Sequence, residues 1–63
     1  MTDLLNLFKG WDTADLFEHH NFVTGKIREA IANGRPDTLE RDFEIVEAIK
    51  TTLAHRGVAY AQA

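Results

Sequence analysis

The chain has 63 residues, of which seven are basic and ten are acidic, and its formal net charge is −3. A chain of this length forms a single domain that buries only about 60% of the surface exposed by its unfolded form, so its own core provides limited stability. It contains no cysteine, which excludes disulfides and thiolate metal sites, and its negative charge disfavours binding to the phosphates of nucleic acids.

The first predicted helix covers about residues 3–9 and is short and strongly apolar. A helix this short is not stable alone in water, so we expect it to pack against another element. Two interpretations stay open. The helix closes the end of the protein's own core, or it presents Leu4, Leu7, Phe8 and Trp11 to another protein, since aromatic side chains in a compact patch are typical anchors of interfaces.

The second predicted helix covers about residues 13–33, and apolar side chains recur in it at helical spacing. Phe22 falls outside this apolar stripe, among charged residues, and is therefore a candidate for a partner surface. Gly25 marks a close helix contact or a slight kink, or it is simply tolerated. The inward positions are Leu16, Val23, Ile27, Ala30 and Ile31, with His20 among them.

A turn is predicted between this helix and the next. Gly34 suits the left-handed conformation that ends a helix, and Pro36 disfavours helical geometry at the residue before it. Asp37 with Glu40 three residues later has the form of a capping box. The consequence is an antiparallel pair of helices joined by a short turn.

The third predicted helix covers about residues 37–56, and its apolar face spans roughly half of its circumference. Its inward positions are Leu39, Phe43, Val46 and Leu53, flanked by Ile45, Ile49 and Ala54. Such a wide face needs two neighbouring helices, so we expect a homodimer that forms a four-helix bundle. The predicted dimer seam consists of Ile45, Ile49 and Thr52, with Phe22 beside it.

Gly57 is expected to end the third helix, with Val58 packed back on it as in a Schellman motif. A single domain then covers residues 1–58. Residues 59–63 are expected to form a flexible tail unless Tyr60, a further candidate anchor for a partner, finds a pocket.

Polar residues interrupt the apolar faces. His20 lies level with Lys50 across the predicted hairpin, so the two residues are candidates for a polar layer that opens at low pH. The other interpretation of His20 is a half-buried histidine that is hydrogen-bonded in the core. Asp42 is expected at the edge of the apolar face, where it keeps its hydration; if buried, it needs a partner such as Arg28 or Arg35.

A metal site is the first alternative function. Asp15 and His19 are four residues apart, a spacing that allows two helical side chains to bind one ion. Two ligands are too few for a metal site, so the third would come from His55 or from a second copy of the chain. No cofactor is predicted.

A DNA-binding helix-turn-helix is the second alternative. The helix after the turn would present an acidic face to the bases, which argues against this function. The basic residues near the turn that could contact phosphates are Lys26, Arg28, Arg35 and Arg41.

Catalysis and membrane insertion find no support in the sequence. The chain has no serine and no cysteine, so the usual nucleophiles are absent, and its four glycines are isolated from one another, so no phosphate-binding loop is formed. We therefore expect no enzyme. The chain opens with no charged leader and contains no long apolar run, so we expect a cytoplasmic protein that does not enter membranes.

Two segments carry a resemblance to a known family. The first is Phe22 with Ile27–Ile31 and Gly34–Pro36, and the second is Asp42 with Val46–Ile49. Together they resemble the closing helices of glucose–fructose oxidoreductase-type dehydrogenases, in which two helices flank a Gly-Arg-Pro turn. That family needs a nucleotide-binding domain, which these 63 residues do not contain, so the resemblance implies no activity and no site residue here.

The sequence thus predicts an all-α antiparallel helical hairpin with a short N-terminal helix, doubled into a four-helix bundle. The predicted function is that of a small non-catalytic protein-binding module, namely an adaptor, inhibitor or regulatory subunit that acts through an apolar helical surface. The predicted partner-binding residues are Leu4, Phe8, Trp11, Phe22, Ile45, Ile49 and Tyr60.

Overall fold

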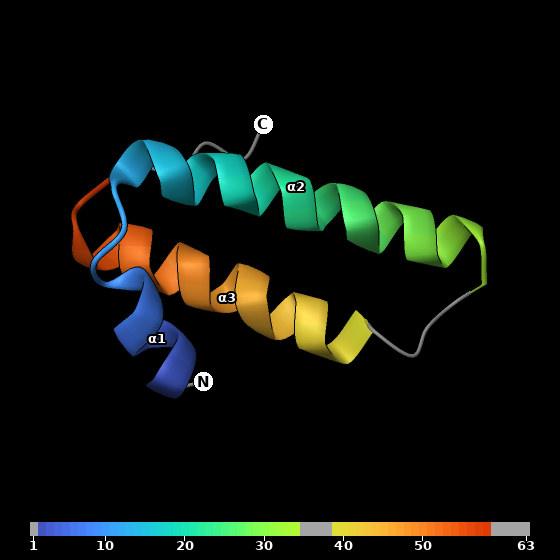
Figure 1. Cartoon of the computed structure of the whole chain (residues 1–63), viewed down its shortest axis with the longest axis horizontal. Helices are drawn as coiled ribbons and strands as arrows, with labels where there is room; N and C mark the ends of the chain where they lie inside the picture. Colours follow the sequence, from blue (N-terminus) through green and yellow to red (C-terminus); the bar gives the residue numbers. More distant parts are fainter. Residues whose placement is uncertain (1, 35–38, 59–63) are drawn as a thin grey trace.

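The computed structural model describes residues 2–34 and 39–58, which form three helices. Helix α1 spans Thr2–Phe8, α2 spans Thr13–Ala32 and α3 spans Leu39–His55. Helices α2 and α3 run antiparallel along the length of the molecule, and α1 packs beside the C-terminal half of α3 (Figure 1). The predicted all-α hairpin with a short N-terminal helix is confirmed, and no strand occurs within the two described ranges.

Three sequence-based predictions fall on residues outside the described ranges. They are the capping box that begins at Asp37, the phosphate or carboxylate contacts of Arg35, and the pocket for Tyr60 in the C-terminal tail.

The backbone at both ends of α2 follows from the residues found there. Asp12 precedes the helix in an extended conformation (φ −66°, ψ 150°), and its carbonyl accepts a hydrogen bond from the Leu16 N–H at 3.0 Å. At the other end Gly34 has φ 67°, and its N–H donates to the Ile31 carbonyl at 3.2 Å. Glycine takes this left-handed conformation without a steric penalty, so the predicted end of the helix is confirmed.

Helix α3 ends in a Schellman motif, as predicted. The Val58 N–H donates to the Leu53 carbonyl at 3.1 Å, and the Gly57 N–H donates to the Ala54 carbonyl at 3.0 Å. Gly57 has φ 74°, which this motif requires. Val58 packs against the core cluster that contains Leu53, so the hydrophobic contact that accompanies such caps is also present.

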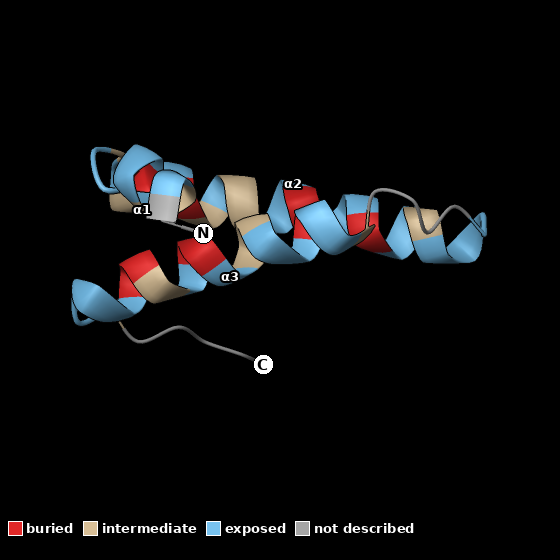
Figure 2. Cartoon of the chain, turned by 90° about the horizontal axis from the view of Figure 1, so that it is seen from below, coloured by how far each residue is buried: buried red, intermediate tan, exposed pale blue. Residues whose placement is uncertain are grey.

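The main hydrophobic core lies at the end of the molecule where α1 meets the hairpin (Figure 2). All three helices contribute to it. Its buried members are Phe8, Leu16, Ala48, Ile49 and Leu53. Burial of one large apolar side chain contributes about 1.5–3 kcal/mol, and Phe8, which is 2% exposed, supplies this to a helix of seven residues. The interpretation that the first helix closes the protein's own core is therefore confirmed for Phe8.

The inward face of α3 differs from the predicted one. Phe43 is 51% exposed, whereas Ile49 is fully buried and Thr52 is 7% exposed. The wide face does have two neighbours, but both belong to the same chain, because α3 packs against α1 as well as α2. The prediction that Ile49 and Thr52 lie in a dimer seam is therefore wrong. The buried Thr52 hydroxyl is satisfied because it donates to the Ala48 carbonyl at 2.8 Å.

Helix α2 follows its predicted face only near the core. Val23 and Ile27 are buried as expected, but Ile31 is 62% exposed. The difference arises because α1 covers the opposite end of the hairpin, so the turn end has no third helix (Figure 1). A Cβ at Gly25 would meet no atom within 4 Å, so this glycine does not mark a close contact.

Candidate functional site

Three aromatic rings form a row along the N-terminal half of α2. The ring centroids of Trp11 and His19 are 5.3 Å apart, and those of His19 and Phe22 are 6.0 Å apart. His19 stacks on Phe22 with an interplanar angle of 24°, while Trp11 makes an edge contact with the core ring of Phe8 at 4.9 Å. The row therefore begins at the core and ends at Phe22, which is 61% exposed.

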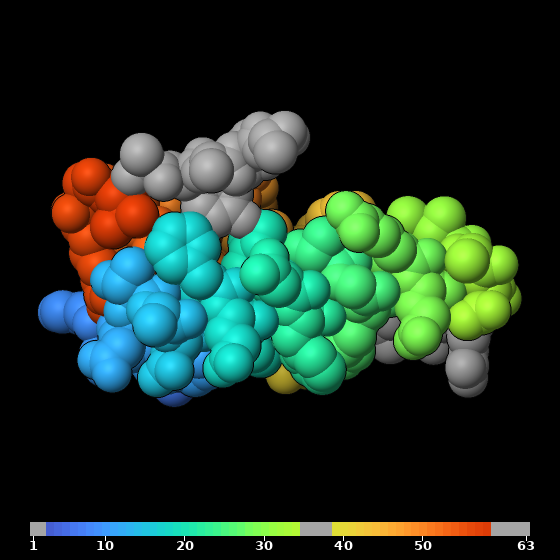
Figure 3. All heavy atoms as spheres, turned by 90° about the horizontal axis from the view of Figure 1, so that it is seen from above, coloured from blue at the N-terminus to red at the C-terminus, as the bar shows by residue number. Residues whose placement is uncertain are grey.

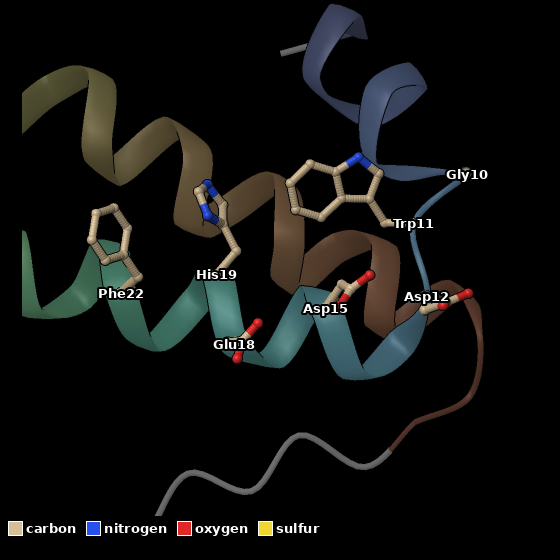
Figure 4. A pocket seen from close by; sticks show the side chains of 7 residues that line it. All are labelled: Gly10, Trp11, Asp12, Asp15, Glu18, His19 and Phe22. Atoms are coloured by element: carbon tan, nitrogen blue, oxygen red, sulfur yellow. The ribbon is translucent and has the colours of Figure 1, made fainter.

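An open pocket of about 620 Å³ lies along this row, and three carboxylates border it (Figure 4). We term it the aromatic groove; its lining residues are Gly10, Trp11, Asp12, Asp15, Glu18, His19 and Phe22. Its size is within the range of pockets that bind small ligands or side chains. Asp12, Asp15 and Glu18 are exposed and form no ion pair with any described residue, so their negative charges are not compensated.

Helical spacing places most of these side chains on one side of α2. Asp15, His19 and Phe22 are separated by four and three residues, and side chains at these separations are neighbours on a helix. Asp12 and Asp15 also lie at the positive N-terminal end of α2, where carboxylates stabilise the helix. The sequence pairs Asp15 with His19 as possible metal ligands and marks Phe22 and Trp11 as candidate anchors, but no sequence pattern predicted that the four residues line one groove.

Arg56 anchors the connection between α1 and α2, which carries Trp11. Its guanidinium donates hydrogen bonds to Thr13 Oγ1 at 3.0 Å, to the carbonyls of Phe8 and Lys9 at 3.4 and 3.1 Å, and to the Trp11 carbonyl. Carbonyls at the end of a helix lack partners within the helix, and α1 has no basic residue in its last turn. The C-terminal end of α3 thus supplies the cation that α1 lacks.

Sequence reasoning missed Arg56 because its partners lie 43 to 48 residues away along the chain. The one signal in the sequence was that the last turn of α1 contains no basic residue to bind its carbonyls. It shows that a donor is needed there, but the sequence does not show which one.

The predicted polar layer of His20 and Lys50 is only partly present. His20 is half-buried on α2, in keeping with the core interpretation of this histidine. Lys50 lies at the surface, where its Nζ is 3.5 Å from Glu47 Oε2 and the two side chains are 45% and 61% exposed. Lys50 does not interrupt the apolar face, because the inward face of α3 is rotated relative to the predicted one.

Asp42 is buried, contrary to the expectation that it keeps its hydration. It is 4% exposed, and its Oδ2 has no hydrogen-bond partner within residues 2–34 and 39–58. Arg28, one of the two arginines considered as partners, is exposed on α2 and forms no ion pair with it. Asp42 faces inward because it lies seven residues before Ile49, on the same side of α3.

The candidate metal ligands do not converge. Asp15 and His19 line the aromatic groove, whereas His55 lines a separate pocket beside α1 with Leu5 and Lys9. In the part of the chain that the structure describes, no group of three or more histidine, aspartate or glutamate side chains could hold a metal ion.

The predicted partner-binding residues divide into four groups. Phe8 and Ile49 are buried in the core and are not available to a partner, which corrects their assignment. The half-buried residues that pack against this core are Leu4, Trp11 and Ile45. Phe22 is well exposed, and Tyr60 lies outside the described residues.

Comparisons with known proteins add no assignment. No family model, no curated protein and no solved structure matches this chain. None of the helices in the described ranges is both long enough and apolar enough to span a bilayer.

Proposed function

We propose that this chain is a small non-catalytic protein-binding module, in the manner of an adaptor, an inhibitor or a regulatory subunit. Its partner binds at the aromatic groove and the exposed apolar side chains of the helices. Phe22 carries the proposal, because its ring is 61% exposed on α2 and its burial by a partner would contribute about 1.5–3 kcal/mol.

The surroundings of Phe22 distinguish it from an ordinary exposed apolar residue. Single apolar side chains on a protein surface are common and need no function. Phe22, however, continues a row of rings through His19 to the half-buried Trp11, and Trp and aromatic clusters are typical of interface hot spots. Helix α2, which carries His19 and Phe22, forms much of one face of the molecule (Figure 3).

The groove supports binding in preference to catalysis. Its three carboxylates are exposed to water, whereas general acids and bases are usually held in partly buried settings that tune their proton affinity. The chain also has no serine or cysteine that could act as a nucleophile.

We also propose that two copies of the chain pair as a homodimer and form a four-helix bundle. Ile31 and Phe43 support this pairing, since they are 62% and 51% exposed at the turn end of the hairpin, where α1 does not reach (Figure 1). A stable interface covers at least about 600 Å² on each partner. The accessible surface of the chain is 4577 Å², so a dimer would cover about an eighth of it.

Site-specific photo-crosslinking tests the partner surface. A benzoylphenylalanine introduced at Phe22 is expected to form a covalent product with a partner protein in cells, and the same group at Lys50, an exposed position of α3 away from the turn, is not. Equal crosslinking at both positions, or none at Phe22, would contradict the proposed surface.

Light scattering over a range of concentrations tests the homodimer separately. The wild-type protein should reach the mass of two copies, and Phe43→Asp should remain at the mass of one copy, because a charge would be buried in the dimer. The mass of one copy for the wild type at every concentration would exclude the homodimer and leave the crosslinked partner as the subject of the proposal.

A further inference from the structure

We infer that the aromatic groove binds an arginine side chain from a basic segment of the partner protein. This inference rests on the proposed function and specifies the chemistry of its partner. It follows from the rings and the carboxylates of the groove taken together.

The rings offer faces to which a cation is attracted. A guanidinium or ammonium group within about 6 Å of an aromatic centroid interacts favourably with the ring quadrupole. The chain already shows this interaction at the groove, since Lys26 Nζ lies 5.7 Å from the centroid of the Phe22 ring. His19 stacks on Phe22 and Lys26 Nζ lies over the same ring, so a planar guanidinium that stacks on Phe22 would take the place of the Lys26 ammonium.

The carboxylates provide charge complementarity beside the rings. Asp12, Asp15 and Glu18 are exposed, and none of them forms an ion pair with a described residue. Asp12 precedes α2, yet its side chain makes no capping hydrogen bond, so it is available to a ligand. An arginine can bind a carboxylate through two parallel N–H donors while its plane lies against a ring.

The dipole of α2 opposes a cation at this end of the helix but does not outweigh the carboxylates. The positive end of a helix corresponds to about half an elementary charge. Three carboxylates line the groove, so the summed charge around a bound cation stays negative.

Arginine fits the groove better than a compact cation. No group of three or more histidine, aspartate or glutamate side chains in the described residues could hold a metal ion. A lysine ammonium is strongly hydrated and has no plane with which to stack. A guanidinium can stack flat on a ring while it makes two parallel hydrogen bonds to a carboxylate, which an ammonium cannot do.

Titration of the full chain with a short peptide tests this inference. The probe is acetyl-Gly-Arg-Gly-amide, and its control carries citrulline, a neutral residue of the same shape, in place of arginine. The arginine peptide should cause saturable NMR shifts at the amides of residues 10–22 and at the Trp11 indole, and the citrulline peptide should bind at least about tenfold more weakly.

Matched substitutions show whether the groove is responsible. Asp15→Asn and Glu18→Gln should weaken arginine binding several-fold, whereas Glu40→Gln and Glu44→Gln, which change the net charge equally on α3, should not. Phe22→Ala should weaken binding, and Phe43→Ala, which removes a similarly exposed ring elsewhere, should not. All six side chains are exposed, so circular dichroism should show unchanged helix content.

Equal affinity for the arginine and citrulline peptides would overturn the inference, as would shifts outside the groove. Saturable binding of tetramethylammonium without binding of the arginine peptide would also overturn it, because the groove would then be a site for small amines. If a partner is crosslinked at Phe22 but the arginine peptide does not bind, this inference is wrong and the proposed function still stands. Absence of any crosslinked partner would remove the proposed function.

Discussion

Asp42 lies in the first turn of α3, is 4% exposed and has an Oδ2 without a hydrogen-bond partner among the described residues. A buried acceptor without a partner lowers stability by about 1–3 kcal/mol. Its position near the N-terminus of the helix recovers only about 0.3–1 kcal/mol through the helix dipole. The unpaired acceptor therefore costs more free energy than the helix dipole returns, so the aspartate lowers the stability of the protein.

Asp42→Leu should raise the free energy of unfolding by about 1–2 kcal/mol, because it removes this carboxylate and adds apolar contact. Urea denaturation measures the change. Glu44→Leu, at an exposed position of the same helix, serves as the control and should change stability by less than about 0.5 kcal/mol. A less stable Asp42→Leu protein would show that the carboxylate is satisfied in solution, for example by ordered water.

Arg56→Lys should destabilise the protein by about 1–2 kcal/mol, because a lysine keeps the charge but loses the planar group that reaches four acceptors. Thermal unfolding and Trp11 fluorescence measure the effect, and the emission should move to longer wavelength as the connection loosens. Arg41→Lys replaces another exposed arginine of α3 and should change neither quantity. An unchanged emission in Arg56→Lys would show that Trp11 is held by its ring contacts alone.

At the scale of the helices, the sequence predicted that three helices exist and that Gly34 and Gly57 end the second and the third. Glycines and helical periodicity act locally, so these features could be predicted without knowledge of the packing. The face of α3 that points inward could not be predicted in this way, because it depends on where α1 packs. Once α1 is the second neighbour, Ile49 faces inward and Phe43 faces outward.

In the aromatic groove, too, some features follow from local sequence patterns and others depend on the packing of the helices. Helical spacing relates Asp15, His19 and Phe22, and the sequence analysis could use it. The position of Trp11 also depends on a hydrogen bond to its carbonyl from Arg56, which is 45 residues away and which no local pattern encodes.

Two glycines within or beside the helices should respond in opposite ways to alanine. Gly25→Ala should stabilise the protein by up to about 1 kcal/mol, since alanine is the better helix former and its Cβ would meet no atom within 4 Å. Gly57→Ala should destabilise it by about 1–2 kcal/mol because φ is 74° there. Chemical denaturation of both variants measures the two changes. A loss of stability in Gly25→Ala would contradict the open surroundings of this residue.

At the scale of the whole molecule, the core is concentrated at one end. The buried cluster joins α1 to the C-terminal half of α3, whereas the turn end of the hairpin carries the exposed Ile31 and Phe43. Regions with few buried apolar contacts open at lower free energy than the rest of a protein. The molecule should therefore open from its turn.

Amide hydrogen exchange should show this gradient along the chain. The amides of 48–53 should exchange slowest, and those of 29–32 and 39–43 should exchange fastest among the helical residues, because only the first group lies in the main core. NMR or mass spectrometry resolves these segments. Equal protection at both ends would indicate that the turn is covered in solution, as in the proposed homodimer.

Trp11 belongs to both the core and the groove, because its ring touches Phe8 on one side and His19 on the other. The groove is thus assembled only when the chain is folded, and a partner bound there must select the folded chain. At a partner concentration of a hundred times the Kd, mass action would add about 2.7 kcal/mol to stability. In so small a domain this added stability would slow proteolysis. The lifetime of the protein in the cell would then increase with the concentration of its partner.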